Sequence, residues 1–300
     1  MNRLRPYLQL IRLPNVFTAF ADICLGALAS GVGLDYWLPF TLLLLASGCL
    51  YCGGMVWNDY FDIDQDKRER PFRPLPSGRI QRSTAGRLGK ALLGIGWLLA
   101  VAAGACRGEW NWIPAVIAAV LVAAILLYDA WLKRTWAGPI AMGTCRFLNV
   151  LLGLCIAGSL TWTSVHLALV VGIYIVGVTW FARKEAAVNN PAILAAAAAT
   201  MLAALVLGLM LPAQLPLGVG SPMFPYLLVV LGFLVGMPVV RAISWPTPPR
   251  VQAAVKRALL GLIVLDAVMA TGVAGAVGLV ILLLLVPVVL LNRQTWLYAT

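Results

Sequence analysis

The chain alternates between long apolar runs and short polar segments. Nine runs are long enough for a transmembrane helix, which needs about 20 apolar residues. They lie near residues 14–34, 38–57, 84–105, 112–132, 139–160, 165–182, 191–212, 224–242 and 254–273, and a tenth covers residues 276–292. This pattern predicts an all-α, polytopic transmembrane bundle of nine to ten helices.

The composition agrees with a membrane protein. Of the 300 residues, 62% are hydrophobic and 11% are charged, whereas a soluble protein is about half apolar and about a quarter charged. The polar segments are too short for a separate soluble domain, so we expect residues 1–300 to form a single transmembrane domain. We also expect no removable signal peptide, because the first apolar run is long and no small-residue cleavage site follows it.

The basic residues predict the orientation. With ten spans, 21 of the 22 Lys and Arg residues fall on one side of the membrane, and only Arg107 falls on the other. Because cytoplasmic loops carry the excess of Lys and Arg, we predict that this side is cytoplasmic, in a bacterial inner (plasma) membrane. The net charge of +11 is therefore an orientation signal, and we expect no nucleic-acid partner.

One apolar run ends in an acidic segment, Asn58-Asp59-Tyr60-Phe61-Asp62-Ile63-Asp64-Gln65-Asp66. On a continuous helix, Asn58, Asp59, Asp62 and Asp66 would share one face. Carboxylates this close repel one another, and a divalent cation relieves that repulsion. Mg²⁺ is usually held by a few carboxylates, waters and substrate phosphates. The segment therefore predicts a magnesium–diphosphate site at the membrane surface.

Basic residues surround this predicted site. The loop that follows the acidic segment contains Arg70, Arg73, Ser77 and Arg79, and its arginines are expected to fold back over the carboxylates. Guanidinium groups suit a diphosphate because they donate several directional hydrogen bonds. The end of the fourth span adds the candidate ligands Tyr128, Lys133 and Arg134. Either cation alone is almost as well explained as an anchor at the membrane surface.

A few polar residues interrupt the spans: Asp22, Arg146, Asn149 and Asp266. Ionisable residues inside a span are usually functional or paired. Arg146 is expected to pair with Asp22 or to reach the diphosphate from below. Asn149 is expected to line a cavity or to join two helices, whereas we favour a structural bond to a neighbouring helix for Asp266.

Cysteine and histidine add no competing chemistry. The Cys49-x-x-Cys52 pair lies inside a span without a second ligand pair, which favours buried apolar packing over metal or redox chemistry. The single histidine, His166, argues against a Ser–His–Asp hydrolase.

These motifs resemble the UbiA superfamily of intramembrane prenyltransferases. Asn58-Asp59-x-x-Asp62-x-x-x-Asp66 is similar to the first aspartate-rich motif of that family, and Arg73-Pro-Leu-Pro-Ser77-Gly78-Arg79 is similar to its Arg-Pro-Leu-x-Ser-Gly segment. Tyr128-x-x-x-x-Lys133-Arg134 looks like its Tyr-x-x-x-Lys element with one extra residue. The resemblance implies a helical bundle around a central cavity that opens to lipid.

The chain departs from the family after the sixth span. The second Asp-x-x-x-Asp motif of the family, which holds a second Mg²⁺, is replaced by Phe181-Ala-Arg183-Lys184-Glu185-Ala-Ala-Val-Asn189-Asn190. Glu185 is the one remaining carboxylate. Either Arg183 and Lys184 replace that metal with fixed positive charge, or catalysis is weakened or lost. This feature and the segments 128–131 and 142–153 resemble the EboC-like branch of the superfamily.

The resemblance implies transfer of an isoprenoid chain from an allylic diphosphate donor to an aromatic or other lipophilic acceptor. Asp59, Asp62 and Asp66, with Asn58, are expected to bind Mg²⁺, while Lys133, Arg134 and Arg73 neutralise the leaving diphosphate. Trp57, Tyr60, Phe61 and Trp131 are candidates for stabilising the carbocation. Two alternatives stay open: a non-catalytic isoprenoid-diphosphate binding or transport protein, and an intramembrane terpene cyclase.

Overall fold

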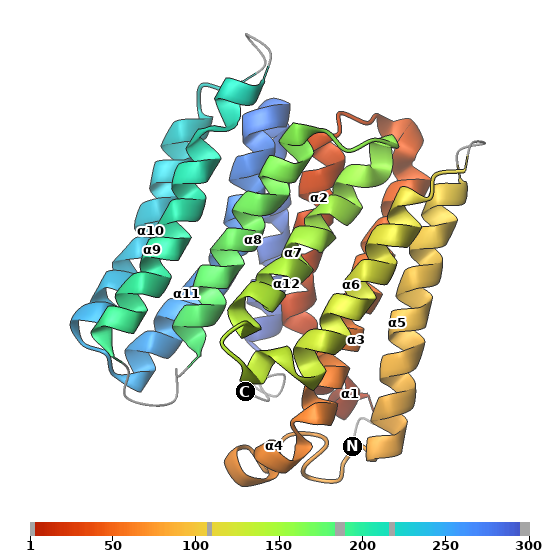
Figure 1. Ribbon diagram of the computed structural model, residues 1–300, viewed down its shortest axis with the longest axis vertical. Coiled ribbons are helices and arrows are strands. Elements are labelled where there is room, and N and C mark those ends of the chain that lie inside the picture. Colours follow the sequence, from red (N-terminus) through yellow and green to blue (C-terminus); the bar gives the residue numbers. More distant parts are fainter. Residues whose placement is uncertain (1–3, 107–109, 184–189, 216–219, 295–300) are drawn as a thin grey trace.

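The protein is an all-α bundle in a computed structural model that describes residues 4–106, 110–183, 190–215 and 220–294. Figure 1 shows long, roughly parallel helices, with the short helix α4 projecting at one end. In chain order, α marking α-helices and η marking 3₁₀-helices, the elements are α1 (Arg5–Leu10), η1 (Leu13–Asn15), α2 (Val16–Ala29), η2 (Leu34–Tyr36), α3 (Trp37–Phe61), α4 (Ile63–Glu69), α5 (Arg82–Ala105), α6 (Ile113–Ala130), η3 (Leu132–Arg134), α7 (Gly138–Leu154), η4 (Cys155–Ala157), α8 (Trp162–Ala182), α9 (Pro191–Leu209), η5 (Leu211–Gln214), α10 (Phe224–Ser244), α11 (Pro248–Ala274), η6 (Gly275–Leu284) and α12 (Leu285–Asn292).

The predicted membrane spans correspond to these helices. Eight described helical segments are long and apolar enough to cross a membrane by length and composition, and Leu13–Ala29 is a shorter apolar segment. The segment Pro248–Asn292 contains both the ninth and the tenth predicted run. The chain reverses within it at Gly275, whose φ of 70° favours glycine, and η6 packs back against α11. The prediction of an all-α polytopic bundle is therefore confirmed.

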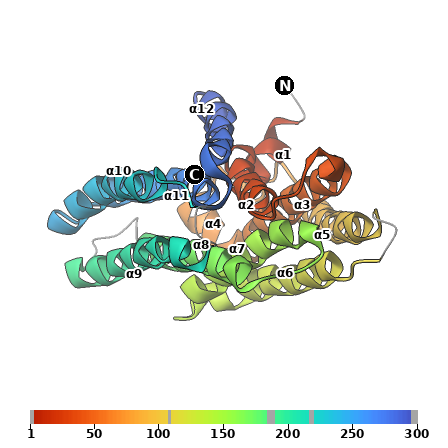
Figure 2. The same cartoon turned by 90° about the horizontal axis from the view of Figure 1, so that it is seen from above.

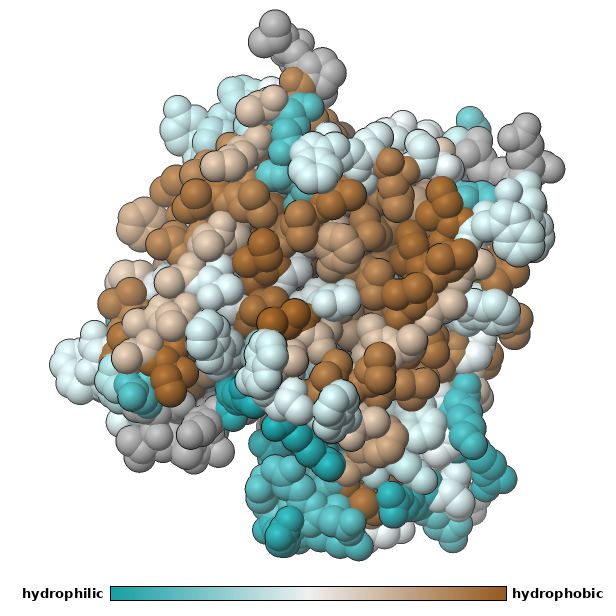
Figure 3. All heavy atoms as spheres, viewed as in Figure 1, coloured by the Kyte–Doolittle hydropathy of each residue, from teal (hydrophilic) through white to brown (hydrophobic). Residues whose placement is uncertain are grey.

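The surface is apolar around the middle of the bundle. Figure 3 shows brown apolar side chains across the centre of one face and hydrophilic side chains gathered at the end that carries α4. Exposed tryptophans mark both ends. Trp37, Trp112 and Trp162 lie where α3, α6 and α8 begin, and Trp131 and Trp245 lie where α6 and α10 end. Tryptophan is enriched at both membrane–water interfaces, so these residues bracket the apolar band.

Small residues allow the central helices to pack closely. Helix α2 contacts α3, α7, α11 and η6, and Figure 2 shows α9 and α10 at one end of the molecule and α5 and α6 at the other. Where α2 crosses α7, a Cβ atom added to Gly26 would lie 2.3 Å from the carbonyl carbon of Gly153. Only glycine permits this approach, which brings the polar residues of α2 and α7 into contact.

Candidate active site

An elongated cavity lies between α2, α3, α6 and α7. It has a volume of about 80 Å³, and its walls include Leu50, Met55, Leu121, Ile125 and Met142. The cavity has two polar regions, one near each end of its apolar wall.

Tyr128 and Asp129 form the polar region nearer α4, and Ser47, Tyr51, Arg146 and Asn149 form the inner region. Along α3, Ser47 lies about 16 Å from Asn58 at a rise of about 1.5 Å per residue. The inner region therefore lies much deeper in the bundle than the acidic segment.

The acidic segment does not form one continuous helix. Helix α3 ends at Phe61, α4 begins at Ile63, and Asp62 between them has φ −93° and ψ 6°. The prediction that Asn58, Asp59, Asp62 and Asp66 share one helix face is therefore wrong. Because the axis changes direction at Asp62, its carboxylate points to a different set of cations from those of Asp59 and Asp66.

The first set pairs two buried carboxylates with two arginines. Arg12 Nη2 donates to Asp59 Oδ1 at 3.1 Å, and Arg73 Nη1 donates to both oxygens of Asp66, at 3.1 and 2.9 Å. The same Arg73 nitrogen is 3.5 Å from Asp59 Oδ1. One cationic nitrogen therefore lies between the two carboxylates, and Asp59, Asp66 and Arg73 are all buried.

The second set joins the end of α3 to the turn after α6. Lys133 Nζ donates to Asp62 Oδ2 at 2.7 Å and to the Asn58 carbonyl at 3.3 Å. Asn58 Nδ2 donates to Asp129 Oδ1 at 3.0 Å, and that oxygen is 3.9 Å from Lys133 Nζ. Arg134, which is more exposed, is 3.5 Å from Asp62 Oδ1. The helix end, Lys133 and the buried Asp129 thus form one connected network.

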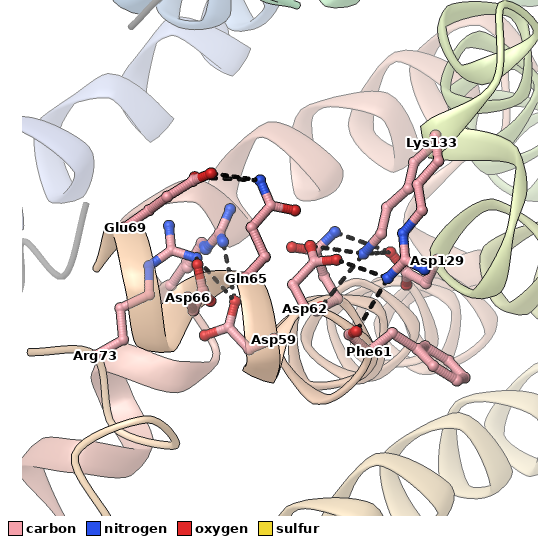
Figure 4. Close-up of polar contacts among 12 residues, drawn as sticks. Asp59, Phe61, Asp62, Gln65, Asp66, Glu69, Arg73, Asp129 and Lys133 are labelled. Atoms are coloured by element: carbon pink, nitrogen blue, oxygen red, sulfur yellow. Dashed lines mark hydrogen bonds and ion pairs between the residues drawn. The ribbon is translucent and has the colours of Figure 1, made fainter. Parts of the chain in front are cut away.

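Figure 4 shows the two sets side by side, with Asp59, Asp66 and Arg73 in one group and Asp62, Asp129 and Lys133 in the other. Within the described ranges, no three carboxyl, thiol or imidazole side chains converge as ligands of a metal ion. The donor atoms nevertheless fit Mg²⁺ in kind, because carboxylate and amide oxygens are its usual protein ligands. Arg73 Nη1 also shows that a positive charge fits between Asp59 and Asp66.

Burial and charge change the pKa values of both arginines. Burial and the nearby charge of Arg12 lower the pKa of Arg73, although Asp59 and Asp66 oppose the change. Burial also acts to lower the pKa of Arg12, but the negative charge of Asp59 helps to raise it above its ordinary value. Both side chains face buried carboxylates, so each supplies a positive charge to the first set.

The loop after α4 uses several predicted ligands for its own structure. Ser77 Oγ donates to the Arg73 carbonyl at 2.6 Å. Arg79 donates to Gln9 Oε1 at 2.9 Å, to Ser77 Oγ and to the Phe72 carbonyl. Arg70 ends α4. Of the three arginines expected to cover the carboxylates, Arg73 is in contact with them, whereas Arg79 ties the loop to α1.

The polar residues inside the spans form a third network, at the inner end of the cavity. Arg146 donates to Asp22 Oδ2 at 3.0 Å and to Thr18 Oγ1 at 2.7 Å. Asn149 Nδ2 donates to the same Asp22 oxygen at 2.7 Å, and Ser47 Oγ donates to Asn149 Oδ1 at 2.8 Å. The predicted Arg146–Asp22 pair is confirmed. Asn149 both lines the cavity and joins helices, so both of its predicted roles are present.

Only part of the region after α8 belongs to the described chain. Arg183 Nη2 donates to the Thr135 carbonyl in the turn after η3. Lys184 and Glu185, the other two residues predicted to replace the second aspartate-rich motif, lie outside the described residues.

Sequence reasoning missed three site residues: Arg12, Tyr51 and Asp129. Arg12 lies far from the acidic segment in sequence, and a φ of 48° turns the chain at this residue so that its side chain meets Asp59. Tyr51 lines the cavity, and the Arg146 guanidinium is 5.6 Å from its ring centroid. The sequence does indicate Asp129 as a site residue, because it is a carboxylate at the end of a span, four residues before Lys133.

The aromatic residues proposed to stabilise a carbocation lie elsewhere. Trp57, Tyr60 and Phe61 pack against one another with ring centroids 5.0 to 5.6 Å apart, and Trp131 is exposed. None of these four rings is among the residues that line the cavity in the described chain. The rings lie away from this cavity because Tyr60 and Trp57 face Gly86 and Gly89 of α5. Tyr51 and Tyr128 are the aromatic residues of the cavity wall.

Comparisons with known proteins show the family and the fold of this chain. The model of the UbiA prenyltransferase family matches residues 19–263. The digeranylgeranylglyceryl phosphate synthase of Ignicoccus hospitalis is 30% identical over 157 residues, which cover 46% of this chain and 51% of that protein. The chain thus matches about half the length of such curated relatives.

Two solved structures share the fold. A structure of digeranylgeranylglyceryl phosphate synthase has a TM-score of 0.66 at 22% identity, covering 91% of this chain and 99% of that one. A UbiA homologue from Archaeoglobus fulgidus bound to GPP and Mg²⁺ has a TM-score of 0.57 at 15% identity, covering 86% and 99%.

Proposed function

This chain belongs to the UbiA prenyltransferase family, and we propose that it transfers an isoprenoid chain from an allylic diphosphate to a lipophilic acceptor. It is a multi-pass integral membrane protein. The observation that carries the proposal is the position of two carboxylate–cation networks beside an apolar cavity. A diphosphate needs cations and hydrogen-bond donors, whereas its isoprenoid chain needs an apolar wall.

Asn58, Asp59, Asp62 and Asp66 would hold Mg²⁺, which when bound neutralises the diphosphate oxygens and assists departure of the leaving group. Lys133 and Arg134 bind those oxygens directly once they release Asp62, and Arg73 adds charge from the other side. The allylic C–O bond breaks with its electron pair on the diphosphate. The apolar wall, including Leu121 and Ile125, keeps water away from the carbocation until the acceptor attacks.

Several finer points belong to this proposal. The relatives are named for a glyceryl phosphate product, which makes a glycerol-type lipid one candidate acceptor. We keep the expectation that the end with α4 is cytoplasmic, in a bacterial inner membrane. The resemblance of the region after α8 to the EboC-like branch stays a prediction.

The test is diphosphate release by purified protein with Mg²⁺ and allylic diphosphates of several lengths. Asp62→Ala removes the carboxylate that holds Lys133, and we expect at least about a tenfold loss of Mg²⁺-dependent donor binding and of release. Asp64→Ala is the matched control, because Asp64 belongs to the same segment but its exposed side chain is paired with the exposed Lys67. Equal losses in both variants would refute the assignment.

The same assay separates the alternatives. Mg²⁺-dependent donor binding without release, in the presence of candidate acceptors, would support an isoprenoid-diphosphate binding protein. Release with an acceptor-free terpene hydrocarbon as the product would support a cyclase.

A further inference from the structure

Two further carboxyl groups lie inside the bundle, away from the proposed diphosphate site. Asp22 on α2 and Asp266 on α11 are both 0% exposed. Helices α2 and α11 pack against each other and bring the two carboxyl groups close enough to interact. Asp22 Oδ2 accepts from Arg146 and Asn149, whereas Asp22 Oδ1 and both Asp266 oxygens have no hydrogen-bond partner in the described chain.

The charges of this cluster do not balance if both carboxyl groups are ionised. Arg146 is the cation that acts on both of them. Tyr174 of α8 donates its hydroxyl to the Ala258 carbonyl at 2.8 Å and so adds no charge. An uncompensated charge in the interior is costly, so one proton shared between two adjacent carboxyl groups is the favourable state. Arg146, Asp22 and Asp266 together then carry no net charge.

Arg146 has more N–H groups than acceptors among the described residues. A guanidinium has five N–H groups, and two of those nitrogens have acceptors in the described residues, Asp22 and Thr18. The side chain is 12% exposed and lines the inner end of the cavity with Ser47 and Asn149. Asn149 already donates both of its amide hydrogens, to Asp22 and to the Ala19 carbonyl. The inner end therefore presents N–H donors of Arg146 without a net charge.

We propose that this inner region, formed by Arg146, Asn149 and Ser47, binds an uncharged oxygen of the acceptor, such as a hydroxyl or a carbonyl, and that the Asp22–Asp266 pair keeps the region neutral. The proposal rests on the proposed prenyl transfer and specifies its acceptor. An apolar isoprenoid chain placed here would leave N–H groups without an acceptor, which is unfavourable. A phosphate placed here would bring negative charge to a cation that Asp22 has already neutralised.

Infrared spectroscopy in an ester-free detergent tests the shared proton and requires no measurement of enzyme activity. We expect the carbonyl stretch of a protonated carboxyl group in the wild type and its loss in Asp266→Asn. Asp66→Asn is the matched control, because Asp66 is also a buried carboxyl but is paired with Arg73 and does not belong to the Asp22–Asp266 pair. A spectrum in this region that Asp266→Asn leaves unchanged would overturn the neutral cluster.

Acceptor preference tests the binding site. The probes are a prenylated glycerol ether and the same ether carrying a phosphate, each supplied with Mg²⁺ and an allylic diphosphate. We expect the wild type to prefer the uncharged ether, and Asp266→Asn to keep that preference because Asp22 still neutralises Arg146. Asp22→Asn/Asp266→Asn keeps the shape but leaves Arg146 uncompensated, so the ratio of the two kcat/KM values should shift toward the phosphate at least about tenfold.

A wild-type preference for the phosphate, or no shift in a double variant that still binds the donor diphosphate, would overturn the proposal. If the double variant does not fold, the acceptor preference of the wild type and the infrared result still decide whether the proposal stands. Absence of diphosphate release in the wild type, with the infrared band present, would instead count against the proposed transfer reaction while leaving the neutral cluster intact.

Discussion

Arg73 offers the sharpest test of the electrostatics at the acidic segment. Its Nη1 atom lies 2.9 Å from Asp66 and 3.5 Å from Asp59, and all three side chains are buried. At an effective dielectric constant of about 20, each contact is worth about 5 kcal/mol before desolvation is subtracted. Removing one partner of a buried ion pair costs about 3–5 kcal/mol net, because it leaves an uncompensated charge. We expect Arg73→Met to lose stability in that range when no divalent cation is present.

Mg²⁺ should then restore the variant more than it stabilises the wild type. In Arg73→Met, the two carboxylates are free to bind a divalent cation, and a ligand at 100 times its Kd stabilises the folded state by about 2.7 kcal/mol. The measurement is thermal unfolding in detergent with a chelator and with increasing Mg²⁺. Arg68→Met is the matched control, because Arg68 is an exposed arginine in the last turn of α4.

Two results would refute this reasoning. A loss of stability in Arg73→Met no larger than in Arg68→Met would mean that the buried contacts contribute little. A response to Mg²⁺ that is the same in Arg73→Met and in the wild type would mean that Asp59 and Asp66 do not bind the cation.

Two further predictions concern other parts of the molecule. Gly26→Ala should destabilise the fold by about 1–3 kcal/mol, because its Cβ would lie 2.3 Å from Gly153, whereas Gly33→Ala, in open space, should have little effect; thermal unfolding compares them. Lys133→Met should weaken donor diphosphate binding more than Arg134→Met, because the Lys133 ammonium is nearly buried and Arg134 is 58% exposed. Equal losses in a donor-binding titration would contradict this ranking.

Most of the fold could be predicted from the sequence because the signal is strong and local. A run of about 20 apolar residues has one stable backbone state in a bilayer, the helix, since every backbone polar group must be bonded internally. The reversal at Gly275 lies in the short gap between the ninth and tenth predicted runs, where glycine readily adopts the positive φ that turns the chain. The irregular geometry of the last span was not predictable, because it depends on packing against α11.

The site could be predicted only in part, because its contacts are not local. The motif predicted which carboxylates matter, but the break at Asp62 divides them between Arg73 and Lys133. The pairing of Arg146 with Asp22 was predictable, since an isolated charge inside a span needs a partner. Arg12 reaches Asp59 across 47 residues of sequence, and no periodicity indicates such a contact.

The 3₁₀ geometry of η6 has a consequence for how the last span matches the bilayer. A 3₁₀-helix rises about 2.0 Å per residue and an α-helix about 1.5 Å. With its first ten residues in η6 and its last eight in α12, Gly275–Asn292 extends about 32 Å, compared with about 27 Å for an α-helix throughout. The hydrocarbon core is about 30 Å thick, so the stretched winding lets a short segment reach both interfaces. A change of η6 from 3₁₀-helix to α-helix would shorten the span by about 5 Å. The length of this span can therefore be matched to bilayers of different thickness.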